Sequence, residues 1–284
     1  MSTHEATGSV PGLPKFIYGT AWKEDETKRL TGLAMEAGFR AVDTANQRRH
    51  YFEQGVGTAL AAAISEGLVT REDLFVQTKF TDRGGQDHRF PYDPAADAGT
   101  QVLQSFDSSL DHLQLGFVDS YVLHGPSQRH GLGSRDLEIW QAMEALHAGG
   151  KVRFIGISNV AIDQLDELLA RCTVRPAFVQ NRCYAATGWD REIRVFCRQN
   201  GIVYQGFSLL TANVNELGSP AFRQLVSRVG KTPAQVVFRF AIQVGMIPIT
   251  GTTDPLHMRE DLGALDFSLS DEDMAFMEGI GNAW

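Results

Sequence analysis

Short apolar runs alternate with amphipathic stretches along the whole chain. The runs are rich in Val, Ile, Leu and Phe and are bounded by polar or glycine-containing segments, a pattern typical of buried parallel strands. We predict a β-strand at each of the eight runs, which cover residues 16–19, 39–42, 74–80, 118–123, 152–157, 178–180, 202–206 and 246–250.

Helical periodicity fills the intervals between the predicted strands. In the first interval Leu30 and Ala34 recur at helical spacing, acidic residues occupy the first turn, and Gly38 is a stop signal. Eight alternating strand–helix units predict the α/β class and a (β/α)8 TIM barrel that forms a single domain over residues 1–284. The predicted helices cover residues 25–37, 53–65, 95–113, 136–148, 162–172, 190–199, 233–243 and 255–262, with two further helices near 221–228 and 271–277.

Composition narrows the kind of protein. The chain has 284 residues, 43% of them hydrophobic, which is enough to bury a large core. Its formal net charge of -8 argues against a general binder of nucleic-acid backbones. No apolar stretch reaches the roughly 18 residues of a membrane span, and residues 1–13 lack the pattern of a signal peptide. We expect a cytoplasmic protein, a monomer or small homo-oligomer, with no membrane or nucleic-acid partner.

The cysteines and loop histidines do not indicate a metal centre. Cys172, Cys183 and Cys197 include no C-x-x-C pair, so we interpret them as reduced, small apolar residues. His88 and His130 are isolated in polar segments, where a histidine is more often solvated than metal-bound. We therefore predict no metal site.

Ionisable residues stand at the ends of successive predicted strands. Asp43 and His124 directly follow the second and fourth predicted strands, and Lys79 is the penultimate residue of the third. Tyr51 lies in the polar stretch NQRRHYFE after Asp43. Because the carboxyl ends of parallel strands meet at one mouth of a barrel, these side chains are expected to converge there.

This set of groups suits the reduction of a carbonyl, whose oxygen gains a proton as hydride reaches the carbon. A lysine ammonium lowers the pKa of a nearby phenol, and an aspartate keeps that lysine charged. Tyr51 would then be the acid, and His124 would donate a hydrogen bond to the substrate oxygen or share its proton with Tyr51. Asp43 and Lys79 could instead be only a buried ion pair that supports the barrel.

The chain contains no G-x-G-x-x-G and no Walker loop, but its motifs resemble those of the aldo-keto reductases. The resemblance extends over nearly the whole chain. It implies a barrel that reduces an aldehyde or ketone and binds NADP(H) in extended form at the strand ends, without a Rossmann fold. The motifs that carry it are YGTAWK, GFRAVDTA, VGTAL, REDLFVQTKF, SLDHLQLGFVDSYVLHGP, GKVRFIGISN, FVQN and IPITGTTDPLHMRED.

The resemblance also implies roles for individual residues. Asp43, Tyr51, Lys79 and His124 correspond to the catalytic tetrad, and Trp22 with Tyr51 and His124 to the walls of the substrate pocket. The nicotinamide carboxamide would contact residues 158, 159 and 180, the ring would stack on residue 207, and residues 251–261 would hold the adenosine end near a helix N-terminus. The implied cofactor residues are Thr20, Asp43, Ser158, Asn159, Gln180, Phe207, Ser208, Leu210, Gly251, Thr252, Thr253, His257, Arg259 and Asp261.

The tyrosine segment departs from the family pattern. Most members have the tyrosine five residues after the aspartate, where this chain has Arg48. Counting back from Glu53 places His50 at the tyrosine position, whereas an insertion in NQRRHY restores Tyr51. We prefer Tyr51, because a histidine cannot supply a phenol.

The expected site for the 2′-phosphate of NADP(H) also departs from the family pattern. Many members have Lys-Ser after the proline and a later arginine, but here the stretch reads ITGTT, and His257 aligns with the arginine. Thr and His provide less positive charge than Lys and Arg. NADP(H) is therefore favoured by the resemblance alone, and NAD(H) is not excluded.

Two further expectations concern the pocket and the function. Residues 81–94 and 127–135 form long loops that would shape the choice of a small carbonyl substrate, with Trp284 or a neighbouring subunit completing the pocket. The alternatives to a reductase are a non-catalytic NADP(H)-binding regulatory subunit and a Schiff-base aldolase or lyase barrel in which Lys79 is the nucleophile.

Overall fold

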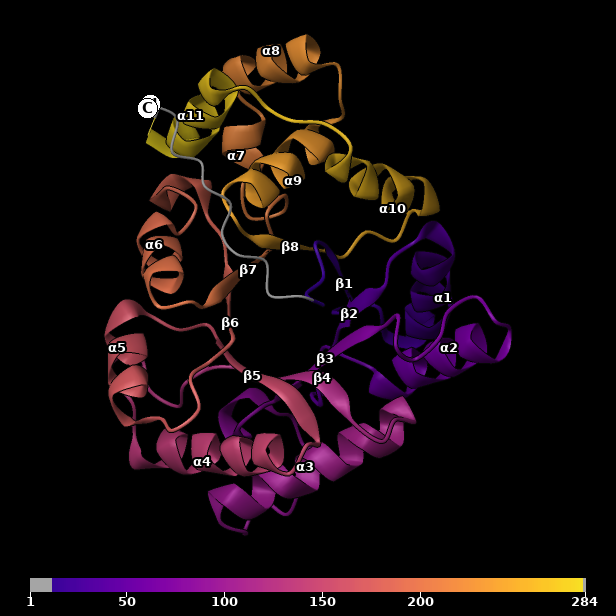
Figure 1. Ribbon diagram of the computed structural model, residues 1–284, viewed down its shortest axis with the longest axis vertical. Helices are drawn as coiled ribbons and strands as arrows, with labels where there is room; N and C mark the ends of the chain where they lie inside the picture. Colours follow the sequence, from indigo (N-terminus) through magenta and orange to yellow (C-terminus); the bar gives the residue numbers. More distant parts are fainter. Residues whose placement is uncertain (1–11, 283–284) are drawn as a thin grey trace.

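In the computed structural model, which describes residues 12–282, parallel strands close into a barrel and helices surround it (Figure 1). Each strand pairs with the next in chain order, and β8 closes the ring by pairing with β1. The predicted single-domain (β/α)8 barrel is thus confirmed. The strands are β1 Ile17–Gly19, β2 Ala41–Asp43, β3 Phe75–Phe80, β4 Val118–Leu123, β5 Val152–Ser158, β6 Phe178–Arg182, β7 Val203–Phe207 and β8 Ile247–Thr250.

The outer ring contains the predicted helices and one short helix, α7, that the sequence analysis did not predict. Its four residues are too few to show a helical repeat. The helices are α1 Thr27–Ala37, α2 Glu53–Ser65, α3 Ala98–Leu113, α4 Ser134–Ala148, α5 Ile162–Arg171, α6 Arg191–Gln199, α7 Val214–Leu217, α8 Pro220–Val229, α9 Pro233–Gln243, α10 Pro255–Leu262 and α11 Asp271–Gly279. Within residues 12–282, none of them is both long and apolar enough to cross a membrane.

Some element boundaries differ from the prediction because backbone groups serve as caps. Strand β2 begins two residues late, since the Phe39 amide donates to the Ala34 carbonyl and so closes the end of α1 around left-handed Gly38. Helix α3 begins at Ala98 rather than residue 95, since the Asp97 side chain accepts from the Thr100 amide as an N-cap.

Close packing of α2 on α3 explains the glycine in the motif VGTAL. A Cβ atom added to Gly57 would lie 2.1 Å from the His112 carbonyl oxygen, much closer than any van der Waals contact. Any larger residue at this position would push α2 and the preceding tyrosine segment away from α3.

Alternation along β3 separates the two cores of the barrel. Val76 belongs to the large core between strands and helices, whereas Phe75 belongs to a small apolar cluster with Ile17, Ala41, Phe178, Ile247 and Ile249. Because side chains alternate along a strand, Gln77 and Lys79 lie on the same face of β3 as Phe75. Since Phe75 is the first residue of β3, apolar side chains fill the amino-terminal end of the barrel and polar ones face its carboxyl-terminal mouth.

Candidate active site

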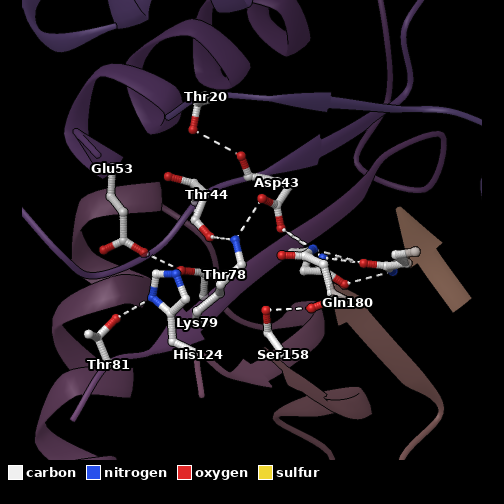
Figure 2. Close-up of polar contacts among 12 residues, drawn as sticks. Thr20, Asp43, Thr44, Glu53, Thr78, Lys79, Thr81, His124, Ser158 and Gln180 are labelled. Carbon is white, nitrogen blue, oxygen red and sulfur yellow. Dashed lines mark hydrogen bonds and ion pairs between the residues drawn. The ribbon is translucent and has the colours of Figure 1, made fainter. Parts of the chain in front are cut away.

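Asp43 and Lys79 form a buried ion pair at the mouth of the barrel. Asp43 pairs with Gln77 across β2 and β3, so Lys79 is two residues nearer the mouth. Its Nζ lies 2.6 Å from Asp43 Oδ2 and donates to the Thr44 carbonyl at 2.9 Å (Figure 2). The Lys79 side chain has no exposed surface. The ammonium is therefore fixed in position on two sides.

Two glutamines donate to the other oxygen of Asp43, and a third glutamine joins them to each other. Gln77 Nε2 and Gln180 Nε2 donate to Asp43 Oδ1 at 2.7 and 3.1 Å, and both also donate to Gln205 Oε1. Of these glutamines, only Gln180 was predicted from the sequence as a site residue, and Gln77 and Gln205 were not. A signal was present, because each is a polar residue that directly follows two apolar or aromatic residues inside a predicted strand, in FVQTKF and VYQGF.

The structure brings Tyr51, rather than His50, against Lys79. Lys79 Nζ lies 5.0 Å from the centre of the Tyr51 ring, and that ring is 5.9 Å from the His124 ring. His50 instead stacks on Trp22 with ring centres 3.9 Å apart, and its carbonyl accepts from the Trp22 amide at 2.7 Å. The extra residues of NQRRHY form a turn that makes this arrangement possible, with the His50 and Tyr51 amides both donating to the Gln47 carbonyl.

The long loop of residues 81–94 supports the tyrosine segment from outside. Gln86 Nε2 donates to the Asn46 carbonyl at 2.8 Å, and Gln47 Nε2 donates to the Gly85 carbonyl at 2.7 Å. Arg89 adds a hydrogen bond to the Arg48 carbonyl. These three hydrogen bonds hold the NQRRHY segment, which has more residues between Asp43 and the tyrosine than the usual spacing of five, in one conformation.

Burial sets the protonation of Tyr51 and Lys79. Burial raises the pKa of Tyr51, and the Lys79 ammonium opposes that shift without reversing it. Burial by itself would lower the pKa of Lys79, but the Asp43 carboxylate and Tyr51 raise it above its ordinary value. The expectation that Lys79 lowers the pKa of Tyr51 overall is therefore wrong, because desolvation is the larger effect. At neutral pH Tyr51 is a phenol and Lys79 an ammonium.

His124 is held as a neutral imidazole. Its Nδ1 lies 2.7 Å from Thr81 Oγ1, a contact drawn in Figure 2. Burial, the Lys79 ammonium and the nearby His50 lower the pKa of His124 to about 3. His124 can thus donate one hydrogen bond at neutral pH but cannot act as an imidazolium acid. Thr81 was not identified from the sequence.

Ser158, Asn159 and Gln180 meet where β5 and β6 end. Ser158 Oγ donates to the Gln180 carbonyl at 2.6 Å, and Asn159 Nδ2 donates to the His124 carbonyl at 2.8 Å. Asn159 has a left-handed φ of 53° and does not cap α5, whose N-cap is Ala161. Within residues 12–282, no side chain or amide donates to Asn159 Oδ1 or Gln180 Oε1, so both oxygens can accept from a ligand.

The ends of β7 and β8 carry the other predicted cofactor residues. Phe207 is the last residue of β7 and is half-buried, Ser208 follows with φ 57°, and Leu210 is partly buried beyond it. Gly251 and Thr253 are exposed just after β8, and Thr252 offers its carbonyl to Tyr18. His257 and Arg259 are exposed on α10.

Thr20 and Asp261 face the barrel wall. Thr20 Oγ1 donates to the Asp43 carbonyl at 2.9 Å, which joins β1 to β2 beside the ion pair. Asp261 is buried and accepts from Thr250 Oγ1 at 2.7 Å, which ties α10 to β8. Asp261, which was predicted to contact the cofactor, thus forms a hydrogen bond within the protein, to Thr250.

Replacing Asp261 with Asn is expected to stabilise the protein at pH 8 but not at pH 4. Burial raises the pKa of Asp261 to about 6, above its ordinary value of 3.8. The stability associated with the protonated carboxyl is thus present below pH 3.8 and is lost as the pH rises through 6. The shift corresponds to about 3 kcal/mol as an upper limit. Urea unfolding of both proteins from pH 4 to pH 8 checks this, and parallel pH profiles would contradict it.

Comparisons with known proteins agree with this architecture. The family model described as Aldo/keto reductase family matches residues 15–282. Deoxymugineic acid synthase 1 of Zea mays is 33% identical over 94% of this chain and 88% of its own length, and glyoxal reductase of Bacillus subtilis is 30% identical over 94% and 89%. The solved structure of a Bombyx mori aldo-keto reductase in complex with NADP superposes with a TM-score of 0.79, at 27% identity over 94% of this chain and 89% of that one.

Proposed function

The chain belongs to the aldo/keto reductase family, and from that premise we propose that it reduces an aldehyde or ketone to an alcohol with NADPH as the hydride donor. The observation that carries the proposal is the grouping of Tyr51 with the Asp43–Lys79 ion pair and neutral His124, at the carboxyl-terminal end of a barrel whose other end is filled by apolar side chains. Each of these groups has a role in delivering a proton to a carbonyl oxygen.

The residues at the strand ends fit a nicotinamide dinucleotide. Asn159 Oδ1 and Gln180 Oε1 can accept from a carboxamide NH2 group, and the half-buried ring of Phe207 can stack on a flat heterocycle. Residues 208–210 and 251–253 would lie along the phosphates and the adenosine. A Bombyx mori relative was solved with NADP, which supports the same cofactor here. When bound, NADPH supplies the hydride.

Tyr51 would donate its phenolic proton to the carbonyl oxygen as negative charge develops there. The Lys79 ammonium would stabilise the resulting phenolate, and Asp43 would keep that ammonium charged and in place. With Thr81 donating to Nδ1, the Nε2–H of His124 would donate to the carbonyl oxygen and orient it. Trp22, which is 70% exposed, would form an outer wall of the substrate pocket.

The alternative in which Lys79 forms a Schiff base is disfavoured. A nucleophilic lysine must lose its proton, and its pKa is commonly lowered for that purpose. The pKa of Lys79 is instead raised by Asp43 and Tyr51 against the effect of burial. A purely regulatory role does not account for the phenol beside this ammonium.

Titration of the purified protein with NADPH and NADH, followed by a carbonyl panel, tests the proposal. We expect saturable quenching of tryptophan fluorescence by NADPH and loss of absorbance at the nicotinamide band when a carbonyl is added. The panel includes glyoxal, because a relative with 30% identity bears the name glyoxal reductase. Binding without turnover on every carbonyl would favour a regulatory subunit, and binding of neither nucleotide would refute the reductase proposal.

A further inference from the structure

Gln77 and Gln205 form a reciprocal pair of side-chain amides inside the barrel. Gln77 Nε2 donates to Gln205 Oε1 at 2.8 Å, and Gln205 Nε2 donates back to Gln77 Oε1 at 3.1 Å. Both side chains are fully buried, although they come from β3 and β7, on opposite sides of the ring of strands. Burying polar groups is costly unless they are paired, and the chemistry proposed above uses neither of these residues.

The Asp43 carboxylate fixes the direction of the hydrogen bonds in this cluster. An ionised carboxylate only accepts, so Gln77 and Gln180, with Nε2 atoms 2.7 and 3.1 Å from Asp43 Oδ1, must both present their NH2 groups to it. Gln205 must then present its oxygen to the same two NH2 groups, at 2.8 and 2.9 Å. Reversing the Gln180 amide would place its oxygen against two acceptors, Asp43 Oδ1 and Gln205 Oε1.

One amide oxygen of the cluster is left for a ligand. Gln77 Oε1 accepts from Gln205, and Gln205 Oε1 accepts from two amides. Gln180 Oε1 accepts from no group in the part of the chain that the structure describes. Because the amide is planar and its NH2 group faces Asp43 and Gln205, this oxygen points away from both of them. Gln205 therefore controls an atom that it does not touch.

We propose that Gln205, held by Gln77, is a positioning residue that keeps the Gln180 oxygen directed at the cofactor, and so makes the site select a ring substituent that donates a hydrogen bond. This inference rests on the proposed function and adds to it a residue that contacts neither cofactor nor substrate. Without Gln205, the Gln180 NH2 group keeps a single hydrogen bond, to Asp43, about which the amide can turn. The site then loses part of its preorganisation.

Calorimetric titration of the full chain with three ligands tests the proposal. The ligands are NADP+, its 3-acetylpyridine analogue, which has a methyl group in place of the carboxamide NH2, and 2′-phospho-ADP-ribose, which lacks the nicotinamide. The wild type should bind NADP+ more tightly than the analogue, because a site built to accept from an NH2 group rejects a ligand without one. In Gln205→Met we expect the ratio of these two dissociation constants to fall by about 2- to 10-fold, the value of one neutral hydrogen bond.

Two further variants support this measurement. Gln77→Met should lower the same ratio by a smaller factor, since Gln205 then still accepts from Gln180 but loses the side chain that holds it. Ile247→Val is the matched control, because Ile247 pairs with Gln205 in the register of β7 and β8 and belongs to the apolar cluster. It removes one methyl group and no hydrogen bond, so the ratio should equal that of the wild type.

The affinity for 2′-phospho-ADP-ribose separates positioning from a purely structural role. Gln205→Met should bind this ligand as the wild type does, since it carries no group that Gln180 could contact. Equal weakening of all three ligands would show that Gln205 only maintains the fold, which contradicts the proposal. If Gln205→Met does not fold, Gln77→Met decides, and an unchanged ratio in that variant overturns the inference.

Failure of the inference differs from failure of the proposed function. An unchanged ratio in Gln205→Met, or a wild type that binds NADP+ and its analogue equally well, overturns the inference and leaves the proposed function intact. A changed ratio in Ile247→Val would also overturn it, because the ratio would then respond to packing alone. If the wild type binds none of the three ligands and no NAD+, the proposed function itself fails.

Discussion

Replacing Tyr51 with Phe is expected to lower kcat/KM for carbonyl reduction by a factor of about 10² to 10⁴, the usual value of a positioned general acid. The substitution removes only the hydroxyl group, and the ring that packs at 5.0 Å from Lys79 Nζ and 5.9 Å from the His124 ring is retained. The affinity for NADPH should change little, because the proton donor belongs to the substrate side of the site. Steady-state kinetics and a binding titration on the same preparation measure the two effects separately.

His50→Ala is the matched comparison for this experiment. His50 is adjacent in the chain and stacks on Trp22, so its removal alters the rim of the pocket without touching Lys79. We expect an increase in KM with a smaller change in kcat than for Tyr51→Phe. Full activity in Tyr51→Phe combined with loss of kcat in His50→Ala would show that the histidine occupies the functional position.

The sequence predicted the barrel well because each strand carries its own signal. Apolar runs such as those of β3 and β4 are bounded by polar residues, and their alternation with helical periodicity allows few other topologies. The boundary of β2 was misplaced because Phe39 has the composition of a strand residue while its amide closes α1. The residue types of a segment do not determine which carbonyl its backbone amides bond to, and here the Phe39 amide donates to Ala34 of the preceding helix.

Residue spacing alone could not decide which residue of the NQRRHY segment lies beside Lys79. Counting from Asp43 and counting from Glu53 gave different residues, since an insertion in a turn can be placed anywhere along it. In the structure Tyr51 lies beside Lys79, and residues 81–94 hold the turn from outside through contacts distant in sequence. The assignment of Tyr51 as the functional residue stays a prediction. Chain positions near Asp43 alone contained no information about these contacts.

The protonation of Tyr51 required burial as well as proximity. From the sequence, a lysine close to a tyrosine lowers the pKa of the phenol. In the folded protein desolvation is the larger effect, so the pKa of Tyr51 is raised. A phenol that keeps its proton until a carbonyl arrives is suited to be an acid, and Lys79 would then act by stabilising the phenolate as it forms.

The largest effect on stability is expected from Lys79→Met. This substitution leaves the Asp43 carboxylate buried without its counter-ion, and breaking a buried pair in this way typically lowers the free energy of unfolding by about 3–5 kcal/mol. Gln77 and Gln180 still donate to Asp43 Oδ1, which reduces the loss but supplies no full charge. Denaturant unfolding at pH 7 measures the difference, and carbonyl reduction should be lost in the same variant.

Combining Lys79→Met with Asp43→Asn separates the two consequences of losing the ion pair. Asparagine retains an oxygen for Gln77 and Gln180 but carries no charge, so the double variant should regain most of the lost free energy of unfolding. Its catalytic activity should remain absent, because no ammonium stands beside the Tyr51 phenolate. If the double variant is as unstable as Lys79→Met, the loss comes from packing rather than from the uncompensated charge. If the double variant reduces carbonyls at the wild-type rate, Lys79 and Asp43 have no part in the chemistry, and their pairing serves only the barrel.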